Sequence, residues 1–265
     1  MNTKKLFVIF ALLLLLTLII IASVFFKEWK MKESIHDLPE IIKANKTLSV
    51  VMEYNSHDFH VAGDSITGSQ YDLCRYIAKR SGLKVQIYLE NDLETSIQKL
   101  ESNVYDVIAQ NIPITNENKQ YLAFTVPITR NKQVLVQRKH TDSDSVFFIA
   151  NQLDLANKTI YVTNNSPSIM RINHLAEEIA EPIHIKEISG YTSEQLLYMV
   201  AKKEIDYAVV DKEITLKNAK LFPDLDFSTD ISFTQLQAWA LRKNAPVLLD
   251  SLNVWITAFK QQNKQ

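Results

Sequence analysis

Strand-like and helix-like patterns alternate along this chain, twice in the same order. From Leu48 the pattern reads strand, helix, strand, helix, strand, and it repeats from about Thr159. The strands are short, apolar and rich in β-branched residues, whereas the helices repeat apolar residues every three or four positions, as at Leu93, Ile97 and Leu100. This alternation favours parallel sheets covered by helices, so the sequence predicts an α/β protein with two similarly built lobes.

The segment 105–138 stands out within this pattern. It reads as a strand, a turn, a short helix capped by Thr115 and a second strand. Strand ends that meet a helix N-terminus present free backbone N–H groups, and open α/β sheets bind small anions and polar ligands there. The segment is therefore interpreted either as part of a ligand site or as an ordinary strand–helix–strand unit.

An uncharged apolar run, residues 6–26, precedes the alternating pattern. At about 1.5 Å per residue, a helix of this length crosses a ~30 Å hydrocarbon core. Lys4 and Lys5 precede the run, which favours a cytoplasmic N-terminus. A cleavable signal peptide is the alternative, because Ala22 and Ser23 are small, but the length of the run favours an uncleaved anchor. The sequence thus predicts a single-pass inner-membrane protein whose folded part lies in the periplasm.

Composition excludes several classes of protein. The chain has a net charge of −1 and no basic tract beyond its first residues, so we expect no nucleic-acid partner. The single cysteine, Cys74, lies in an amphipathic pattern and is expected to be a buried structural thiol. His57 and His60 share a loop with no third ligand at a suitable spacing, so no metal is expected. With four glycines and neither G-x-S-x-G nor H-E-x-x-H, the sequence predicts no cofactor and no hydrolytic motif.

Five ordered segments resemble a known family. They are GSQYDLCRYIAKRSG, YDVIAQNIPIT, LANKTIYVTNNS, EIDYAVVD and QAWALRK. In order and spacing they are similar to the extracellular solute-binding proteins of family 3, with the strongest likeness to the non-catalytic amino-terminal module of membrane-bound lytic murein transglycosylase F. The resemblance covers residues 46–262. It implies a periplasmic-binding-protein type II fold, in which two lobes close on a ligand about a hinge.

The apolar run and the polar stretch that follows it predict an anchor (1–30) and a polar helical connector (31–46). The resemblance implies that the rest is divided into a discontinuous lobe 1 (47–136 and 230–262) and an inserted lobe 2 (139–227). The strands that cross between the lobes are expected near 134–139 and 227–232.

A ligand site between the lobes is implied as well, but part of it is altered. In the family, a T-x-x-R pattern supplies an arginine that forms a bidentate pair with a ligand carboxylate. Thr115 is present, but Asn118 stands at the arginine position, and Pro113 replaces a Ser or Thr. A buried carboxylate without a charged partner is unfavourable, so a ligand other than a free α-carboxylate is expected unless Lys119 or Arg130 compensates.

Other residues match contact positions of the family, each with a structural alternative. Asp211 matches the aspartate that receives a ligand amino group, or it caps the helix expected near Ile214. Ser166 and Ser168 match residues that bind an anion, or they only begin their helix. Tyr54 matches an aromatic wall or is a core residue, and the two asparagines of the first lobe bind a neutral group or finish a turn. The full candidate site is Tyr54, Asn111, Thr115, Asn118, Ser166, Ser168 and Asp211.

Two functions follow from the resemblance. In the first, the protein closes on a small polar ligand (an amino acid, a short peptide or a cell-wall fragment) and serves transport or sensing with a transporter permease. In the second, the cleft is degenerate and the protein is a regulatory scaffold beside a cell-wall enzyme. Catalysis is not expected, because the related transglycosylase carries its catalytic glutamate in a further C-terminal domain and this sequence ends at Gln265.

Overall fold

The computed structural model describes residues 15–21, 23, 36–140 and 146–263. Two compact units are present, Met1–His36 and Asp37–Gln265. In the first unit, the described residues 15–21 and 23 are helical. None of the helices within the described ranges is both long and apolar enough to cross a membrane. Most of the 6–26 run, where the sequence predicts a transmembrane helix, lies outside the described residues.

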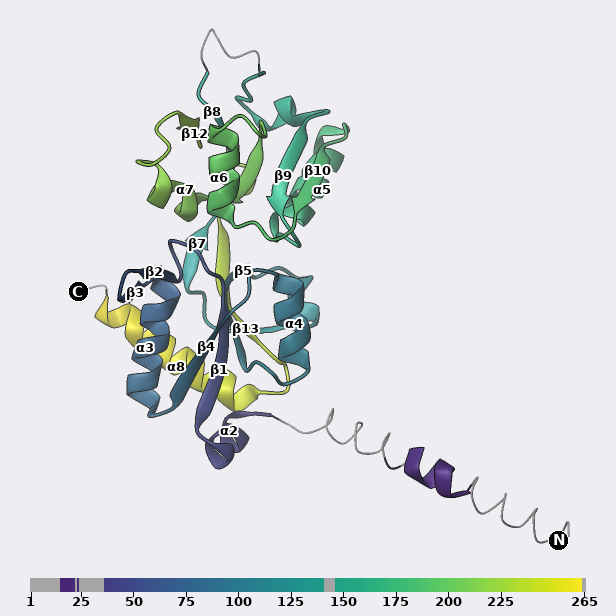
Figure 1. Ribbon diagram of the computed structural model, residues 1–265, viewed down its shortest axis with the longest axis vertical. Helices are drawn as coiled ribbons and strands as arrows, with labels where there is room; N and C mark the ends of the chain where they lie inside the picture. Colours follow the sequence, from purple (N-terminus) through teal and green to yellow (C-terminus); the bar gives the residue numbers. More distant parts are fainter. Residues whose placement is uncertain (1–14, 22, 24–35, 141–145, 264–265) are drawn as a thin grey trace, which may run out of the picture. The chain divides into compact units, whose positions relative to one another are not determined.

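Lobe 1 is built on a mixed sheet with the strand order β4-β1-β5-β13-β6, in which β7 also pairs with β13 (Figure 1). Its strands are β1 (Thr47–Met52), β4 (Lys84–Leu89), β5 (Val107–Pro113), β6 (Ala123–Phe124), β7 (Thr129–Asn131) and β13 (Gln235–Leu241). Strands β4 and β5 run parallel to β1 on either side, and β13 is antiparallel to β5. The sheet is therefore parallel where the sequence pattern alternates, and the antiparallel strand is the one that returns from lobe 2.

Helices cover both faces of this sheet. They are α2 (Leu38–Ala44), α3 (Ser69–Ser81), α4 (Leu93–Glu101) and α8 (Pro246–Gln262); β2 (His60–Ala62) and β3 (Ser65–Thr67) form a separate hairpin. Successive residues of β1 point to opposite faces. Val50 packs in a cluster with Leu73 of α3 and Leu248 of α8, whereas Val51 packs in a cluster with Leu100 of α4. Both faces of β1 are therefore covered by apolar layers.

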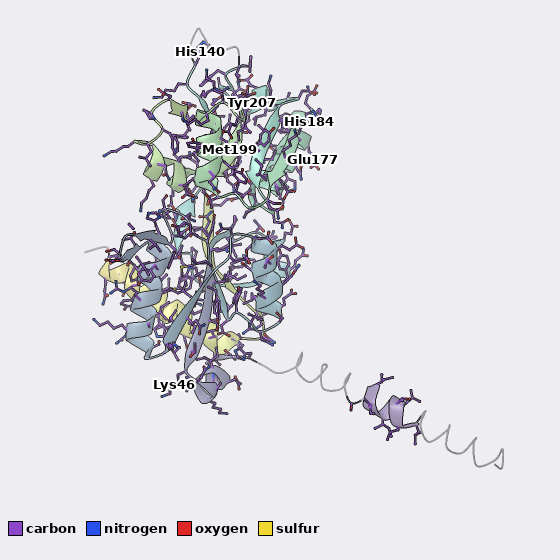
Figure 2. The ribbon with its side chains drawn as sticks, in the orientation of Figure 1. Lys46, His140, Glu177, His184, Met199 and Tyr207 are labelled. Atoms are coloured by element: carbon purple, nitrogen blue, oxygen red, sulfur yellow. The ribbon has the colours of Figure 1, made fainter. Side chains whose placement is uncertain are left out.

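Lobe 2 repeats the plan with the strand order β10-β9-β11-β8-β12. Its elements are β8 (Gln133–Arg138), η2 (Gln152–Leu155), β9 (Thr159–Thr163), α5 (Ser168–Ile179), β10 (His184–Ile188), α6 (Ser193–Ala201), β11 (Ala208–Asp211), α7 (Lys212–Asn218) and β12 (Leu225–Asp226). Helix α5 packs on one face of the sheet through Ile172 and Leu175, and α6 packs on the other through Leu196 and Val200. Figure 2 shows the side chains of this lobe, with Met199 on α6 and His184 at the start of β10.

The chain crosses between the lobes at two places. The first crossing is at Lys132, between β7 and β8. Residues 133–136, which the resemblance placed in lobe 1, instead pair with β11 in the sheet of lobe 2. On the return, Ile231 donates its N–H to the carbonyl of Gln133 at 2.8 Å, and Ser232 Oγ accepts from the N–H of Gln133 at 2.9 Å. The chain therefore leaves lobe 2 after Ser232 and enters β13 at Gln235.

The segment expected as a connector, 31–46, belongs to lobe 1 from Asp37 onward. Leu38 and Ile41 of α2 are buried in the lobe 1 core. Asp37 caps α2, and its carboxylate also accepts hydrogen bonds from the N–H groups of Val247 (3.0 Å) and Leu248 (2.7 Å) at the start of α8. One carboxylate therefore satisfies the first turns of two helices, which fixes α2 to the lobe.

Candidate functional site

A cleft lies between the two lobes, where strands of both sheets end. It collects polar residues that end or follow β1, β5, β9 and β11, and it contains about 80 Å³ of open space. Its charged lining residues are Glu53, His57, Asp58, Asp211 and Glu213. Within the described ranges, no lysine or arginine lines this cleft. Carboxyl ends of strands at a change of strand order are the usual ligand-binding place in open α/β sheets.

Two carboxyl groups of the cleft titrate near neutral pH. Burial, followed by the negative charges of Asp58, Glu194 and Asp211, raises the pKa of Glu53 to about 8. Burial also raises the pKa of Asp211 to about 7, although the hydrogen bond from Gln237 (3.4 Å) opposes this shift. Like charges in a partly dehydrated space disfavour ionisation, and such perturbed pairs are typical of functional sites.

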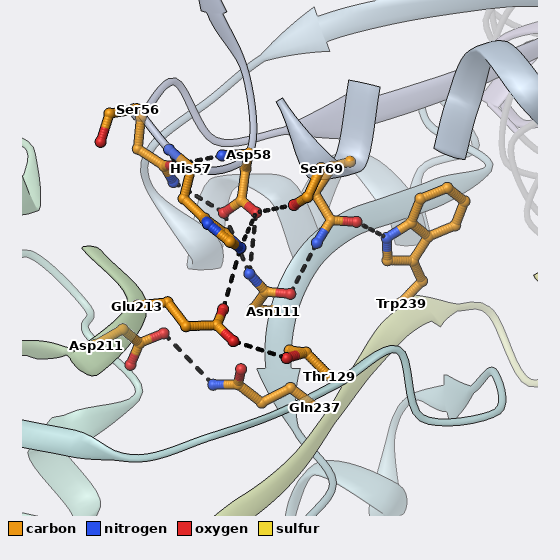
Figure 3. Close-up of polar contacts among 12 residues, drawn as sticks. Ser56, His57, Asp58, Ser69, Asn111, Thr129, Asp211, Glu213, Gln237 and Trp239 are labelled. Atoms are coloured by element: carbon orange, nitrogen blue, oxygen red, sulfur yellow. Dashed lines mark hydrogen bonds and ion pairs between the residues drawn. The ribbon is translucent and has the colours of Figure 1, made fainter. Parts of the chain in front are cut away.

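Asp58 is a buried acid in the lobe 1 wall. Its carboxylate accepts hydrogen bonds from Asn55 Nδ2 (3.0 Å), Ser69 Oγ (3.1 Å) and Asn111 Nδ2 (3.1 Å), as Figure 3 shows in part. Only 3% of its surface is exposed. Three donors satisfy its oxygens, so Asp58 acts through its charge more than through free hydrogen-bonding capacity.

A chain of hydrogen bonds connects this carboxylate to the core of lobe 1. Trp239 Nε1 donates to Gln70 Oε1 (2.6 Å), and Gln70 Nε2 donates to Asn111 Oδ1 (2.8 Å) (Figure 3). The bond to its oxygen fixes the amide of Asn111 with its nitrogen toward Asp58. The network therefore joins α3, β5 and β13 to the loop after β1 and makes that wall of the cleft rigid.

Charged side chains bridge the lobes directly on one side of the cleft. His57 Nε2 lies 3.1 Å from Glu213 Oε2, and Thr129 Oγ1 donates to Glu213 Oε1 at 2.9 Å (Figure 3). The hydrogen bond with Glu213 raises the pKa of His57. The pKa of Glu213 lies below its usual range. Burial acts to raise this pKa, but the hydrogen bonds from His57 and Thr129 and the charge of His57 outweigh that effect. Ser56 adds a second bridge by donating both its N–H and its hydroxyl to Glu194 Oε1, at 2.8 and 2.9 Å.

A further bridge involves Asp92 at the start of α4. Its Oδ1 accepts hydrogen bonds from the side-chain amides of Asn164 (3.3 Å) and Asn165 (2.7 Å) of lobe 2. Its Oδ2 caps α4 through the N–H of Thr95 at 3.0 Å. The lobes of this structure therefore contact each other through several separate groups of polar side chains.

Three buried amide side chains form the floor of the cleft, where the chain crosses between the lobes. Asn131 ends β7, Gln133 begins β8 and Gln237 lies in β13; they are 4%, 3% and 1% exposed. Asn131 Nδ2, Gln133 Oε1 and Gln237 Oε1 have no hydrogen-bond partner among the described residues. Buried polar atoms are nearly always satisfied, so these three call for a partner in the cleft.

Comparison with known proteins defines the family. Residues 48–265 match the sequence profile of the bacterial extracellular solute-binding proteins, family 3. The chain belongs to this family. The expected resemblance is thereby confirmed, and the cleft described above is that of a family 3 solute-binding protein.

Curated relatives of this family 3 protein include membrane-bound lytic murein transglycosylases F. The protein from Desulfosudis oleivorans is 26% identical over 224 residues, which are 83% of this chain and 47% of that protein. The protein from Saccharophagus degradans is 24% identical over 201 residues, or 76% of this chain and 39% of that protein. The chain thus spans less than half the length of these two relatives.

Similar solved structures confirm the periplasmic-binding-protein-like α/β fold. Holo ArgBP from T. maritima has a TM-score of 0.71 and 24% identity, covering 84% of this chain and 94% of that chain. The amino acid ABC transporter substrate-binding protein AbpA from Streptococcus pneumoniae, bound to L-arginine, has a TM-score of 0.70 and 18% identity, covering 84% and 93%. At these identities the likeness extends to the fold alone.

The structure places four of the candidate site residues in the lining of the family 3 cleft: Asn111, Ser166, Ser168 and Asp211. Asp211 immediately precedes α7, yet its side chain makes no capping hydrogen bond and turns to Gln237 instead. The hydroxyl groups of Ser166 and Ser168 bond to each other at 2.7 Å, and Ser166 Oγ also accepts from the N–H of Ser168 at 3.3 Å. Ligand contact by these residues stays a prediction.

The other three candidates, Tyr54, Thr115 and Asn118, are not in the lining of the cleft. Thr115 Oγ1 accepts from the N–H of Asn118 (3.1 Å), and Asn118 Nδ2 donates to the carbonyl of Pro113 (3.0 Å). These bonds complete a turn that leads into a short 3₁₀ helix, η1 (Asn118–Gln120), in the stretch where the sequence predicts a short helix. Tyr54 is 37% exposed and packs its ring 6.4 Å from that of Phe59.

Among the residues that the structure describes, no lysine or arginine of the cleft lining takes the place of the missing arginine. Lys119 is exposed and absent from the lining, and Arg130 lines a separate groove beside α8. Neither residue is therefore placed to compensate for Asn118.

The sequence pattern did not identify Glu53, Gln133 and Gln237 as site residues. Glu53 directly follows β1, one position before the predicted aromatic wall, and the two glutamines interrupt apolar strands. A polar residue within a strand that crosses between lobes is the signal that would have identified them. His57, expected to be a surface or packing residue, lies in the bridge to Glu213. No group of three His, Cys, Asp or Glu side chains in the described part of the chain is placed to hold a metal ion.

Proposed function

We propose that this family 3 protein is a membrane-tethered, extracytoplasmic solute-binding protein that closes on a small polar ligand, such as an amino acid, a short peptide or a cell-wall fragment. The observation that carries the proposal is the floor of the cleft, where three amides more than nine-tenths buried present unpartnered atoms. A polar ligand between the lobes satisfies these atoms, and two crossing segments provide the hinge. Binding without turnover, in transport with a permease or in sensing, is the role we infer.

The proposed location is the periplasmic face of the inner membrane. The apolar run 6–26 is the proposed single-pass anchor. The names of the transglycosylase relatives, which are membrane-bound, support this location. An anchor of this kind holds the cleft close to a membrane or cell-wall partner.

A regulatory scaffold beside a cell-wall enzyme is the second candidate function. It is supported by the direct bonds between the lobes, such as the pair of His57 with Glu213, and by the small open space of about 80 Å³. In this role the lobes stay closed on each other and the outer surface binds the partner.

Thermal melting separates the two functions. The full chain in mild detergent is melted with amino acids, amines, dipeptides and muropeptides. A ligand at ~100 times its Kd adds about 2.7 kcal/mol to the free energy of unfolding, which raises the Tm by several degrees. We expect one ligand class to raise the Tm and Asp211→Asn to reduce this rise. The matched control is Glu117→Gln, which makes the same kind of change at an exposed site outside the cleft. A panel without any shift contradicts solute binding and favours the scaffold.

A further inference from the structure

We propose that the ligand is an organic cation without a carboxylate, an amine or a guanidine, whose charged head group is bound by Glu53, Gln133 and Gln237. This inference rests on the proposed binding function and specifies its ligand class. It follows from the acidic lining of the cleft, from its unpartnered hydrogen-bonding atoms and from the absence, in the described lining, of a lysine or arginine that could pair with a ligand carboxylate.

The acidic groups that line the cleft favour a bound cation, which stabilises their ionised forms, over a bound anion. Four acidic residues line it, Glu53, Asp58, Asp211 and Glu213, and within the described ranges no lysine or arginine does. His57, which also lines the cleft, is already paired with Glu213 across it at 3.1 Å. A cleft lined by one sign of charge, with walls that exclude water, concentrates ligands of the opposite sign.

The free hydrogen-bonding atoms of the cleft are mainly acceptors. Gln133 Oε1 and Gln237 Oε1 are unpartnered among the described residues, and the remaining unpartnered floor atom, Asn131 Nδ2, is a donor. Gln237 Nε2 donates to Asp211 Oδ2, which orients its oxygen away from that carboxyl group (Figure 3). Asp211 is also the cross-strand partner of Gln133, so these acceptors are neighbours. Ammonium and guanidinium groups carry three and five N–H donors and no acceptor, which matches this set.

In the described part of the chain, no lysine or arginine lines the cleft to pair with a ligand carboxylate. Asn118 and Pro113 replace the residues that hold one in the family, and Lys119 and Arg130 lie elsewhere. In lobe 2, the hydroxyl groups at the start of α5 bond to each other. A carboxylate would therefore be dehydrated among like charges, which is unfavourable.

The geometry favours an organic cation over a metal ion. No set of three acidic, histidine or cysteine side chains in the described ranges is arranged as metal ligands. The open space of about 80 Å³ accommodates a head group, and opening about the hinge admits the rest of the molecule.

Matched ligand pairs that differ only in the carboxylate test this inference. The full chain in mild detergent is titrated with arginine and agmatine, with lysine and cadaverine, and with glutamate, alanyl-alanine and calcium ions. We expect agmatine or cadaverine to bind at least about tenfold more tightly than the corresponding amino acid. Glu53→Gln is expected to weaken this binding by about 30-fold or more, and Gln133→Met by a smaller factor, whereas Glu117→Gln leaves it unchanged. The Tm of each variant shows whether it is folded.

The outcomes separate this inference from the proposed function. Tighter binding of the amino acid than of its decarboxylated partner, or binding of only neutral, anionic or calcium ligands, overturns the cation inference and leaves solute binding in place. A cation that binds to Glu53→Gln and to Gln133→Met as tightly as to the wild type also overturns the inference. If none of the ligands in the panel binds, both the cation inference and the proposed solute-binding function are contradicted.

Discussion

Replacing Gly68 by alanine is expected to destabilise the protein by about 3 kcal/mol or more and to displace Asp58 from the cleft wall. Gly68 has a φ of 147°, and an added Cβ would lie 2.1 Å from the carbonyl oxygen of Asp58 and 2.7 Å from the nitrogen of Phe59. These are backbone atoms of the loop that ends in the start of α3, where Ser69 N–H bonds to the carbonyl of His57 at 2.9 Å. The loop must move for the methyl group to fit. Chemical denaturation measures the loss as a lower midpoint.

Gly190→Ala is the matched control for Gly68→Ala. Gly190 also has a positive φ, 77°, but nothing lies within 4 Å of its added Cβ. Only the backbone strain of about 1–2 kcal/mol is expected there. Equal losses at both positions would show that the close approach to Asp58 is not what makes Gly68 necessary.

Replacing Glu53 by glutamine is expected to raise the free energy of unfolding by about 1–3 kcal/mol at about pH 8. The pKa of Glu53 is raised from 4.5 to about 8, mainly by burial and further by Asp58, Glu194 and Asp211. Between these two pH values the folded state binds a proton that the unfolded state has lost. Wild-type stability therefore falls as the pH rises through this window, and the glutamine variant lacks this part of the fall. The expected gain in the free energy of unfolding is smaller than the full pKa shift would give, because Glu53 is partly exposed and solvent screens its charge.

Denaturation of both proteins between about pH 4 and pH 9 measures this effect. The two curves should converge near pH 4 and separate as the pH rises, while Glu117→Gln follows the wild type. A lower stability of Glu53→Gln at about pH 8 would mean that the carboxylate stabilises the fold. Greater stability with weaker ligand binding is the behaviour expected of a group retained for function.

Much of the fold was predictable because its signals are local. The alternating patterns predicted both lobes, and apolar residues three or four apart predicted helices such as α4. The crossing at Lys132 was misplaced because β8 reads as one uninterrupted strand, and sequence does not show which sheet a strand joins. The anchoring of α2 also depends on a distant contact, from Asp37 to the start of α8.

The candidate site was predictable only in part for the same reason. Asp211 ends a strand and is recognisable by position, but only the structure shows that its side chain leaves the helix uncapped. Thr115 and Asn118 fit a family pattern, yet their bonds close a local turn. Successive residues of a strand point to opposite sides, so a choice between Glu53 and Tyr54 at the end of β1 required the packed lobes. The unpartnered oxygens of Gln133 and Gln237 lie on strands that are far apart in the sequence, so the sequence does not show that they share one cleft.

Proton release on ligand binding tests the central claim, that the cleft binds a cation through its carboxyl groups, most directly. The full chain is titrated calorimetrically with agmatine at about pH 7 in two buffers of different ionisation enthalpy. At that pH Glu53, with a pKa of about 8, is mostly protonated and Asp211, with a pKa of about 7, is about half protonated, and a bound cation favours the ionised forms of both. The account predicts binding with release of on the order of one proton, reduced in Glu53→Gln. Binding without proton release, or with proton uptake, would contradict it.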